Sequence, residues 1–148
     1  MSEVDTIFSE LHVEVLNTGR HFSLLKEFIY SPPEGEAVVA HAGFKTDFAS
    51  IPRVATIFIP KLGRYTQPAV IHDYLCRKAD NWKQRRQGDK VFREAMEVVK
   101  VHLVKRWLMY WAVWVAGMIA WGLAKVGIHG RVRKQYDEDE RAKKAAQA

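Results

Sequence analysis

Residues 68–77 read Pro68-Ala69-Val70-Ile71-His72-Asp73-Tyr74-Leu75-Cys76-Arg77, and this stretch divides the chain into a strand-rich half and a helical half. Proline is favoured in the first turn of a helix, because its missing N–H would have no partner there in any case. No glycine or proline follows before Arg77, so the stretch predicts a helix. That helix would carry His72 and Asp73, the first candidates for a functional site.

Three segments that precede this helix have patterns typical of β-strands. Residues 11–16 alternate apolar and polar side chains, residues 22–30 are rich in aromatic and branched side chains, and residues 37–48 follow a turn. The short connections favour antiparallel pairing, because parallel strands need a long crossover. We therefore expect an α+β protein, with a small antiparallel sheet in the N-terminal half followed by two or three helices.

The chain after this helix begins with a polar and basic segment, residues 78–88, which ends at Gly88. A second helical pattern follows, with apolar positions on one face at Phe92, Ala95, Met96, Val99 and Leu103. Asp89 would then lie in the first turn of that helix, where a carboxylate complements the helix dipole. No glycine or proline interrupts the chain from there to Gly117, so the sequence allows either one long helix or a bend near Val101.

Residues 107–124 form an apolar helical segment of 18 residues without a charge, which is the lower end of what spans a bilayer. Its large side chains repeat at spacings of 4, 3, 4 and 3, at Trp107, Trp111, Trp114, Met118 and Trp121. This stripe fits a helix buried in its own domain, an interface for self-association or a membrane contact. We expect a single domain over residues 1–130 and a charged, solvated tail over residues 131–148.

Composition limits the classes of protein that the chain can belong to. A single cysteine, Cys76, excludes an internal disulfide and fits a reducing compartment. The acidic first 15 residues do not resemble a secretory signal. Residues 77–106 hold ten Lys or Arg against four acids, a basic patch that suits an anionic partner. The sequence has no recognisable nucleic-acid module, so nucleic-acid binding is not our prediction.

Several blocks of residues, in order along the chain, resemble one known family. They begin with residues 42–53, which include Thr46-Asp47 and Ser50-Ile51-Pro52-Arg53. They continue with Gly63-Arg64-Tyr65, residues 69–76, Asp89 with Phe92 and Ala95-Met96, and Arg106 with Met109-Tyr110. The chain thereby resembles, over about residues 36–117, a family found mainly in tailed phages and prophages and catalogued as domain of unknown function 1353. The resemblance implies a phage protein with a shared polar site and no assigned reaction.

Four residues are the predicted site: Asp47, His72, Asp73 and Asp89. Carboxylates and a neutral imidazole are suitable ligands for zinc or manganese, and a bound metal lowers the pKa of water. The first functional hypothesis is therefore a phage accessory hydrolase that acts on cell-wall or nucleotide bonds. In it the four residues serve as metal ligands or as catalytic acid and base. The sequence leaves open whether the protein is an enzyme.

Two alternatives remain at this stage. In a purely structural role, Asp47 caps a turn, Arg53 or Arg64 pairs with Asp73, and His72 donates to a backbone carbonyl. In the other alternative the protein is not an enzyme, and its apolar helix contacts phage structural proteins, a second copy or a membrane through Trp107, Trp111, Trp114 and Trp121. The corresponding locations are the host cytoplasm or the virion, with the inner membrane as a further possibility.

Overall fold

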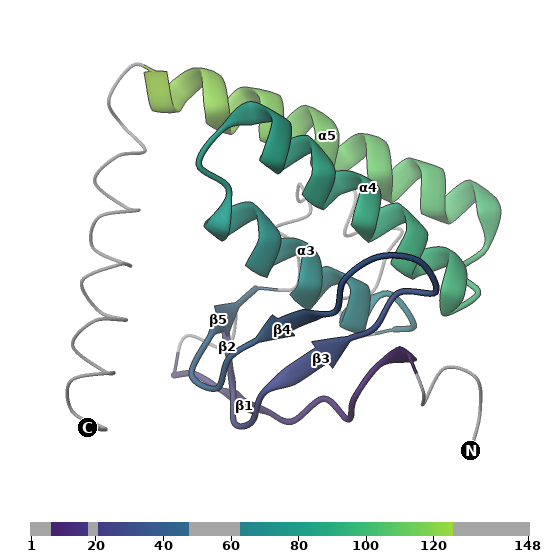
Figure 1. Ribbon diagram of the computed structural model, residues 1–148. Helices are drawn as coiled ribbons and strands as arrows, with labels where there is room; N and C mark the ends of the chain where they lie inside the picture. The colour runs from purple at the N-terminus through teal and green to yellow at the C-terminus, as the bar shows by residue number, and fades with distance from the viewer. Residues whose placement is uncertain (1–6, 18–20, 48–62, 126–148) are drawn as a thin grey trace. The chain divides into compact units, whose positions relative to one another are not determined.

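The computed structural model describes residues 7–17, 21–47 and 63–125 (Figure 1). The chain divides into two compact units, Met1–Trp114 and Val115–Ala148. The first unit contains small antiparallel sheets, then two helices and the first half of a third, and the second unit contains the rest of the third helix. This order confirms the predicted α+β class. The predicted tail and residues 48–53 of the family stretch lie outside the described residues.

The strands form two antiparallel sheets instead of one. In the first sheet, β2 (Phe22–Leu24) lies between β1 (Val13–Val15) and β5 (Lys45–Thr46). The register pairs Glu14 with Ser23 and Phe22 with Thr46. The second sheet is a hairpin of β3 (Phe28–Tyr30) and β4 (Val38–Ala40).

Two of the predicted strands were too long, because each contains a turn. Residues 22–30 separate into β2 and β3, and residues 37–48 into β4 and β5, so these two predictions of continuous strands were wrong. The second turn depends on Gly43, whose φ of 82° is a conformation that glycine adopts readily. The Gly43 N–H donates to the carbonyl of Leu24 at 2.7 Å, which holds this turn against β2.

Aromatic side chains fill the space under the second sheet. The ring of Phe8 stacks on Phe28 and on Tyr30, at centroid distances of 5.9 and 4.7 Å. These three side chains are almost fully buried, as is Phe44 beside β5. Burial of such large apolar surfaces is the main stabilising contribution to a domain of this size.

The predicted helix at residues 68–77 is confirmed as α3 (Thr66–Lys78). It buries the run from Pro68 to Asp73 and packs against β4 and β5 on one side and against α4 on another (Figure 1). Arg77 and Lys78 occupy its last turn, where cations interact favourably with the helix dipole. The first half of α3 is therefore enclosed between sheet and helix.

The second helix, α4 (Trp82–Val98), begins six residues before Gly88, inside the segment that was predicted to be a polar connection. The Asn81 side chain accepts a hydrogen bond from the Gln84 N–H at 2.9 Å, and the Gln84 side chain accepts one from the Asp80 N–H at 2.7 Å. These contacts satisfy free N–H groups at the helix start. The prediction that Asp89 lies in the first turn was wrong, because Asp89 lies near the middle of α4.

A defined turn separates α4 from α5 (Leu103–Lys125). The Val101 N–H donates to the Met96 carbonyl and the Lys100 N–H donates to the Glu97 carbonyl, both at 2.9 Å. This pattern is a Schellman motif, and Lys100 takes its left-handed position with a φ of 56°. Of the two arrangements that the sequence allowed, the structure therefore has the break near Val101.

The buried side of α5 in the first unit is not the tryptophan stripe. Met109 and Val113 are buried, whereas Trp107 and Trp111 are 39% and 52% exposed. The interpretation of the stripe as a buried core was therefore wrong for these two tryptophans. In the part of the chain that the structure describes, no helix combines the length and the apolar character needed to cross a membrane.

Candidate functional site

The candidate site lies between α3 and α4, where both helices contribute buried polar side chains. From α3 come His72 and Cys76, which are one helical turn apart on the same face. From α4 comes Asp89, which is fully buried. His72 is 4% exposed, and Cys76 is partly exposed.

Gly88 allows the two helices to approach closely at this point. A Cβ atom at position 88 would lie 3.3 Å from both the Cys76 Sγ and the Leu75 Cβ, which is tighter than most real contacts. Because glycine has no side chain, α4 can bring the neighbouring Asp89 against α3. The glycine that we took for a boundary before the helix thus has a packing role within it.

The His72 ring has an acid at each of its nitrogens. Its Nε2 is 2.8 Å from Asp89 Oδ1, within hydrogen-bonding distance, and its Nδ1 is 3.8 Å from Asp73 Oδ1. Burial lowers the pKa of His72, but Asp73 and Asp89 raise it more, so the net pKa lies above its usual value. The ring therefore tends to hold its second proton, unless another cation replaces it.

Asp73 in turn contacts the end of the first sheet. The Thr46 hydroxyl, which is fully buried in β5, donates a short hydrogen bond to Asp73 Oδ2. Asp47 is the next residue after Thr46, at the edge of the described segment. The structure thereby connects β5, α3 and α4 through Thr46, Asp73, His72 and Asp89.

Two arginines of α4 compensate the buried charge of Asp89. Arg86 Nη1 is 3.0 Å from Asp89 Oδ2, and Arg85 Nη2 is 3.9 Å from Oδ1. The Arg86 guanidinium lies over the rings of Trp82 and Trp114, at 5.0 and 4.4 Å from their centroids. This cation–π stacking keeps a charged group at a site with little access to water.

Three side chains form a possible metal-ligand group: His72, Cys76 and Asp89. Their ligand atoms all lie within 4.8 Å of one another, and the Cys76 Sγ is 3.3 Å from His72 Nε2. Asp73 and Asp47, which we predicted as ligands, are not members of this group. Cys76 was missed as a candidate, although its position four residues after His72 on a predicted helix could have indicated it.

The contacts proposed for a purely structural role differ from those found. His72 faces Asp89 instead of a backbone carbonyl, and Arg64 donates a long hydrogen bond of 3.5 Å to the Lys100 carbonyl instead of pairing with Asp73. Those two expectations were wrong. Arg53, the other proposed partner of Asp73, lies outside the described residues.

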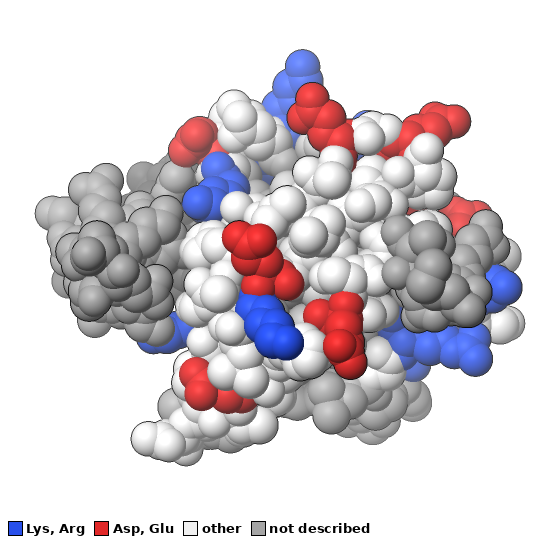
Figure 2. All heavy atoms as spheres, turned by 60° about the horizontal axis from the view of Figure 1, so that its bottom comes forward, with Lys and Arg blue, Asp and Glu red and all other residues white. Residues whose placement is uncertain are grey.

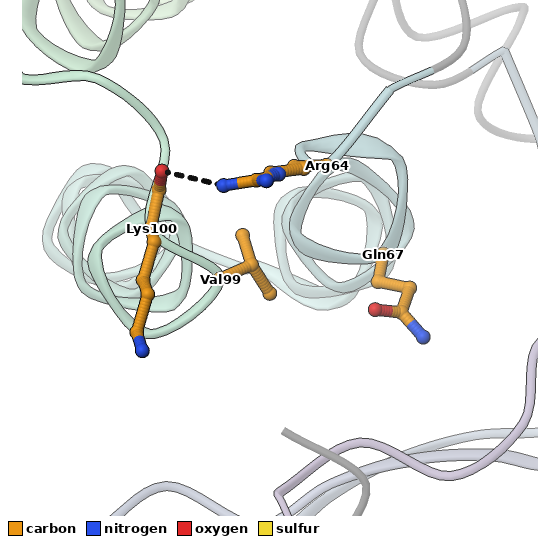
Figure 3. Close-up of a pocket in the computed structure, with 4 residues that line it drawn as sticks. All are labelled: Arg64, Gln67, Val99 and Lys100. Atoms are coloured by element: carbon orange, nitrogen blue, oxygen red, sulfur yellow. Dashed lines mark hydrogen bonds between the residues drawn. The ribbon is translucent and has the colours of Figure 1, made fainter. Parts of the chain in front are cut away.

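Two other features of the surface show no comparable convergence of candidate ligand side chains. An open pocket of about 310 Å³ lies at the start of α3 and the end of α4, where Arg64 reaches toward the Lys100 carbonyl (Figure 3). The described residues that line it are Arg64, Gln67, Val99 and Lys100, and none of these four belongs to the predicted site. On the face that Figure 2 brings forward, the acidic and basic side chains of the described residues are scattered among uncharged ones.

Fold and site together define a small α+β protein with a buried cluster of histidine, cysteine and aspartate between two helices. A family model described as "Protein of unknown function (DUF1353)" matches residues 22–113, which is more than half of the chain. The protein belongs to the DUF1353 family, as the resemblance in its sequence predicted. No curated protein and no solved structure matches the chain at a significant level.

Proposed function

We propose that the protein is a hydrolase that depends on a divalent metal held by His72, Cys76 and Asp89. The observation that carries this proposal is the convergence of three ligand atoms, from two helices, within 4.8 Å. Three protein ligands with one open position are typical of catalytic zinc sites. A metal there would supply Lewis acidity and lower the pKa of water at the open position.

The chemistry of the donor atoms fits zinc better than manganese. A thiolate is a soft ligand and selects zinc, whereas manganese prefers carboxylates and water. Binding would release protons, because His72 and Cys76 coordinate a metal in their deprotonated forms.

The remaining residues would position the ligands. Asp73 Oδ1 lies 3.8 Å from Nδ1 of His72, on the side where a carboxylate orients the ligating histidine in many zinc proteins, and a small shift of Asp73 would be needed to form that hydrogen bond. Thr46 fixes Asp73 by its hydrogen bond. Arg86 holds one oxygen of Asp89 and leaves Oδ1 directed at His72. Asp89 would thus have its orientation fixed before a metal binds, by Arg86 on one oxygen and His72 on the other.

The substrate class in this proposal is a cell-wall or nucleotide bond, within the phage accessory role that the family resemblance implies. The partly exposed Cys76 lies at the accessible side of the cluster. The Arg85 guanidinium, 3.9 Å from Asp89 Oδ1, adds positive charge beside the site. Positive charge there favours a substrate with an anionic group, such as a phosphodiester.

The first experiment is metal analysis of the purified protein after loading with zinc. We expect about one zinc per chain, lost in His72→Ala and Asp89→Asn and weakened in Cys76→Ser. Asp73→Asn should lower zinc affinity by about 10- to 100-fold without abolishing binding. His12→Ala is the matched control, because His12 pairs with Glu10 away from the cluster.

The second arm tests hydrolysis with a chromogenic phosphodiester and with purified peptidoglycan. The zinc-loaded protein should act on one of them, and His72→Ala should not. An absence of zinc under all loading conditions would contradict the metal site. Bound zinc without hydrolysis of either substrate would contradict the hydrolase and leave the metal site standing.

A further inference from the structure

The first half of α5 has a large exposed apolar face that the cluster does not explain. It consists of five side chains, which we call the α5 stripe: Leu103, Val104, Trp107, Leu108 and Trp111. Their exposed fractions run from 39% for Trp107 to 68% for Val104. Contiguous apolar surface of this kind on a folded protein usually marks a site of interaction.

The spacing of the α5 stripe places its members on one side of the helix. Positions 103, 104, 107, 108 and 111 follow the i, i+1, i+4, i+5, i+8 pattern of a single helical face. The protein's own fold covers another side of α5, where Met109 and Val113 are 1% and 4% exposed. Packing among the residues that the structure describes therefore accounts for one apolar side of α5 and leaves the stripe exposed.

The charges around the α5 stripe are positive. Between Val98 and Lys125 the sequence has no Asp or Glu. Arg93 of α4 lies over the Trp107 ring at 5.1 Å from its centroid, whereas Lys105 lies on a neighbouring side of α5, where its ammonium is 5.0 Å from the centre of the Tyr65 ring. The one acid that contacts α5 among the described ion pairs is Glu97, which pairs with Arg106 at 3.5 Å.

We infer that the α5 stripe binds the surface of an anionic lipid bilayer, with the helix lying along the interface. Tryptophan beside Lys and Arg is the composition of helices that lie in that interface. Charge complementarity favours lipid over a second copy, because two stripes face to face would bring Arg93 near its own counterpart. Anionic headgroups would neutralise the same cation.

The test is flotation of the full-length protein with lipid vesicles, some of neutral phosphatidylcholine and some containing phosphatidylglycerol. We expect binding to the anionic vesicles and little to the neutral ones. The double variant Leu108→Gln/Trp111→Gln should bind at least about tenfold more weakly, because two large apolar side chains no longer enter the interface. Arg93→Gln should weaken binding by about fivefold.

Leu25→Gln is the matched control, because Leu25 is an exposed apolar residue beside the first sheet and 55% exposed. It should bind vesicles as the unchanged protein does. Thermal unfolding checks that the stripe variants remain folded. Vesicle binding requires no metal, so this proposal fails or stands independently of the hydrolase.

Three results would overturn the inference. Equal binding to neutral and anionic vesicles would remove the role of charge. Equal binding by Leu108→Gln/Trp111→Gln would remove the role of the stripe. Absence of binding to the anionic vesicles would overturn the inference by itself, and a dimer that this double variant dissociates in sedimentation equilibrium would then assign the surface to a second copy.

Discussion

Tyr65 and Asp73 are both buried polar residues, but they differ in their hydrogen bonding. Asp73 accepts a hydrogen bond from the Thr46 hydroxyl. The Tyr65 hydroxyl is buried and has no hydrogen-bond partner among the residues that the structure describes. A buried polar group without a hydrogen-bond partner destabilises a protein. Removal of a buried group that has a partner is costly, because the partner is left unsatisfied. Removal of the two hydroxyls should therefore have different effects.

We predict that Tyr65→Phe leaves the free energy of unfolding unchanged or raises it by up to about 1 kcal/mol. Thr46→Val should lower it by about 1 to 3 kcal/mol, because Asp73 then loses a partner in a buried environment. Urea unfolding of the two variants measures both effects. A loss for Tyr65→Phe as large as that for Thr46→Val would show that the Tyr65 hydroxyl is satisfied in solution.

Three residues of the site were predicted from the sequence, and one was missed. His72, Asp73 and Asp89 were identified as candidates, and the structure brings these three together. Cys76 was missed although it follows His72 by four residues on the predicted helix, because that spacing alone does not show that a third ligand lies nearby. Its relevance depends on the approach of α4, a tertiary contact that no local pattern in α3 contains.

At the scale of elements, α4 shows where sequence patterns were sufficient and where we misread them. Asn81 followed three residues later by Gln84 is a known signal for a helix start, and the structure has the helix beginning at Trp82. The polar composition of residues 82–88 obscured that signal. Residues 82–88 are helical although they are polar, because Phe92 and Met96 in the following turns of α4 supply the buried apolar surface.

The short strands were harder to predict for a physical reason. Residues 22–30 are rich in apolar side chains throughout, so their composition does not reveal the point at which the chain leaves one sheet for another. The division between β2 and β3 is set by pairing with distant segments, residues 13–15 and 38–40. Such non-local pairing is not encoded in the propensity of the strand itself.

The contact of α3 with α4 at Gly88 leads to a prediction about that helix pair. Gly88→Ala adds a Cβ atom 3.3 Å from the Cys76 Sγ, which should separate the helices and weaken zinc binding. The gain in helix propensity, about 1 kcal/mol, should be offset by the crowding. Gly122→Ala in α5 is the control, because its added Cβ meets no atom of the described residues within 4 Å beyond its chain neighbours and the backbone of its own helix.

The Gly122→Ala variant should gain up to about 1 kcal/mol in free energy of unfolding, whereas Gly88→Ala should be neutral or less stable. Denaturant unfolding and zinc titration of both variants check this. Equal stabilisation of the two, with zinc affinity unchanged, would show that the helices have room at Gly88.

At the scale of the whole molecule, two buried tyrosines predict sensitivity to alkali. Burial raises the pKa of Tyr30 above 10.0, with a further contribution from Glu94, and burial also raises the pKa of Tyr65. The folded protein therefore holds these phenolic protons more tightly than the unfolded chain does. Their contribution to stability is complete below pH 10.0 and is lost as the pH rises through the raised values.

We expect the urea midpoint to fall steeply as the pH is raised past 10.0, and to fall less steeply in a Tyr30→Phe/Tyr65→Phe variant. The comparison is made as the difference in slope between the two proteins, since lysines titrate in the same range. Identical slopes would mean that the two phenols ionise as readily in the folded state as in the unfolded one.

The position of Arg86 between two indole rings has a practical consequence. Its cation lies 5.0 Å from the Trp82 ring centre and 4.4 Å from that of Trp114, so it joins α4 to the first half of α5. Indole emission depends on nearby charge, and separation of the two helices would remove that charge from one ring. The protein thus carries an intrinsic optical reporter of this helix contact, readable by fluorescence without any added label.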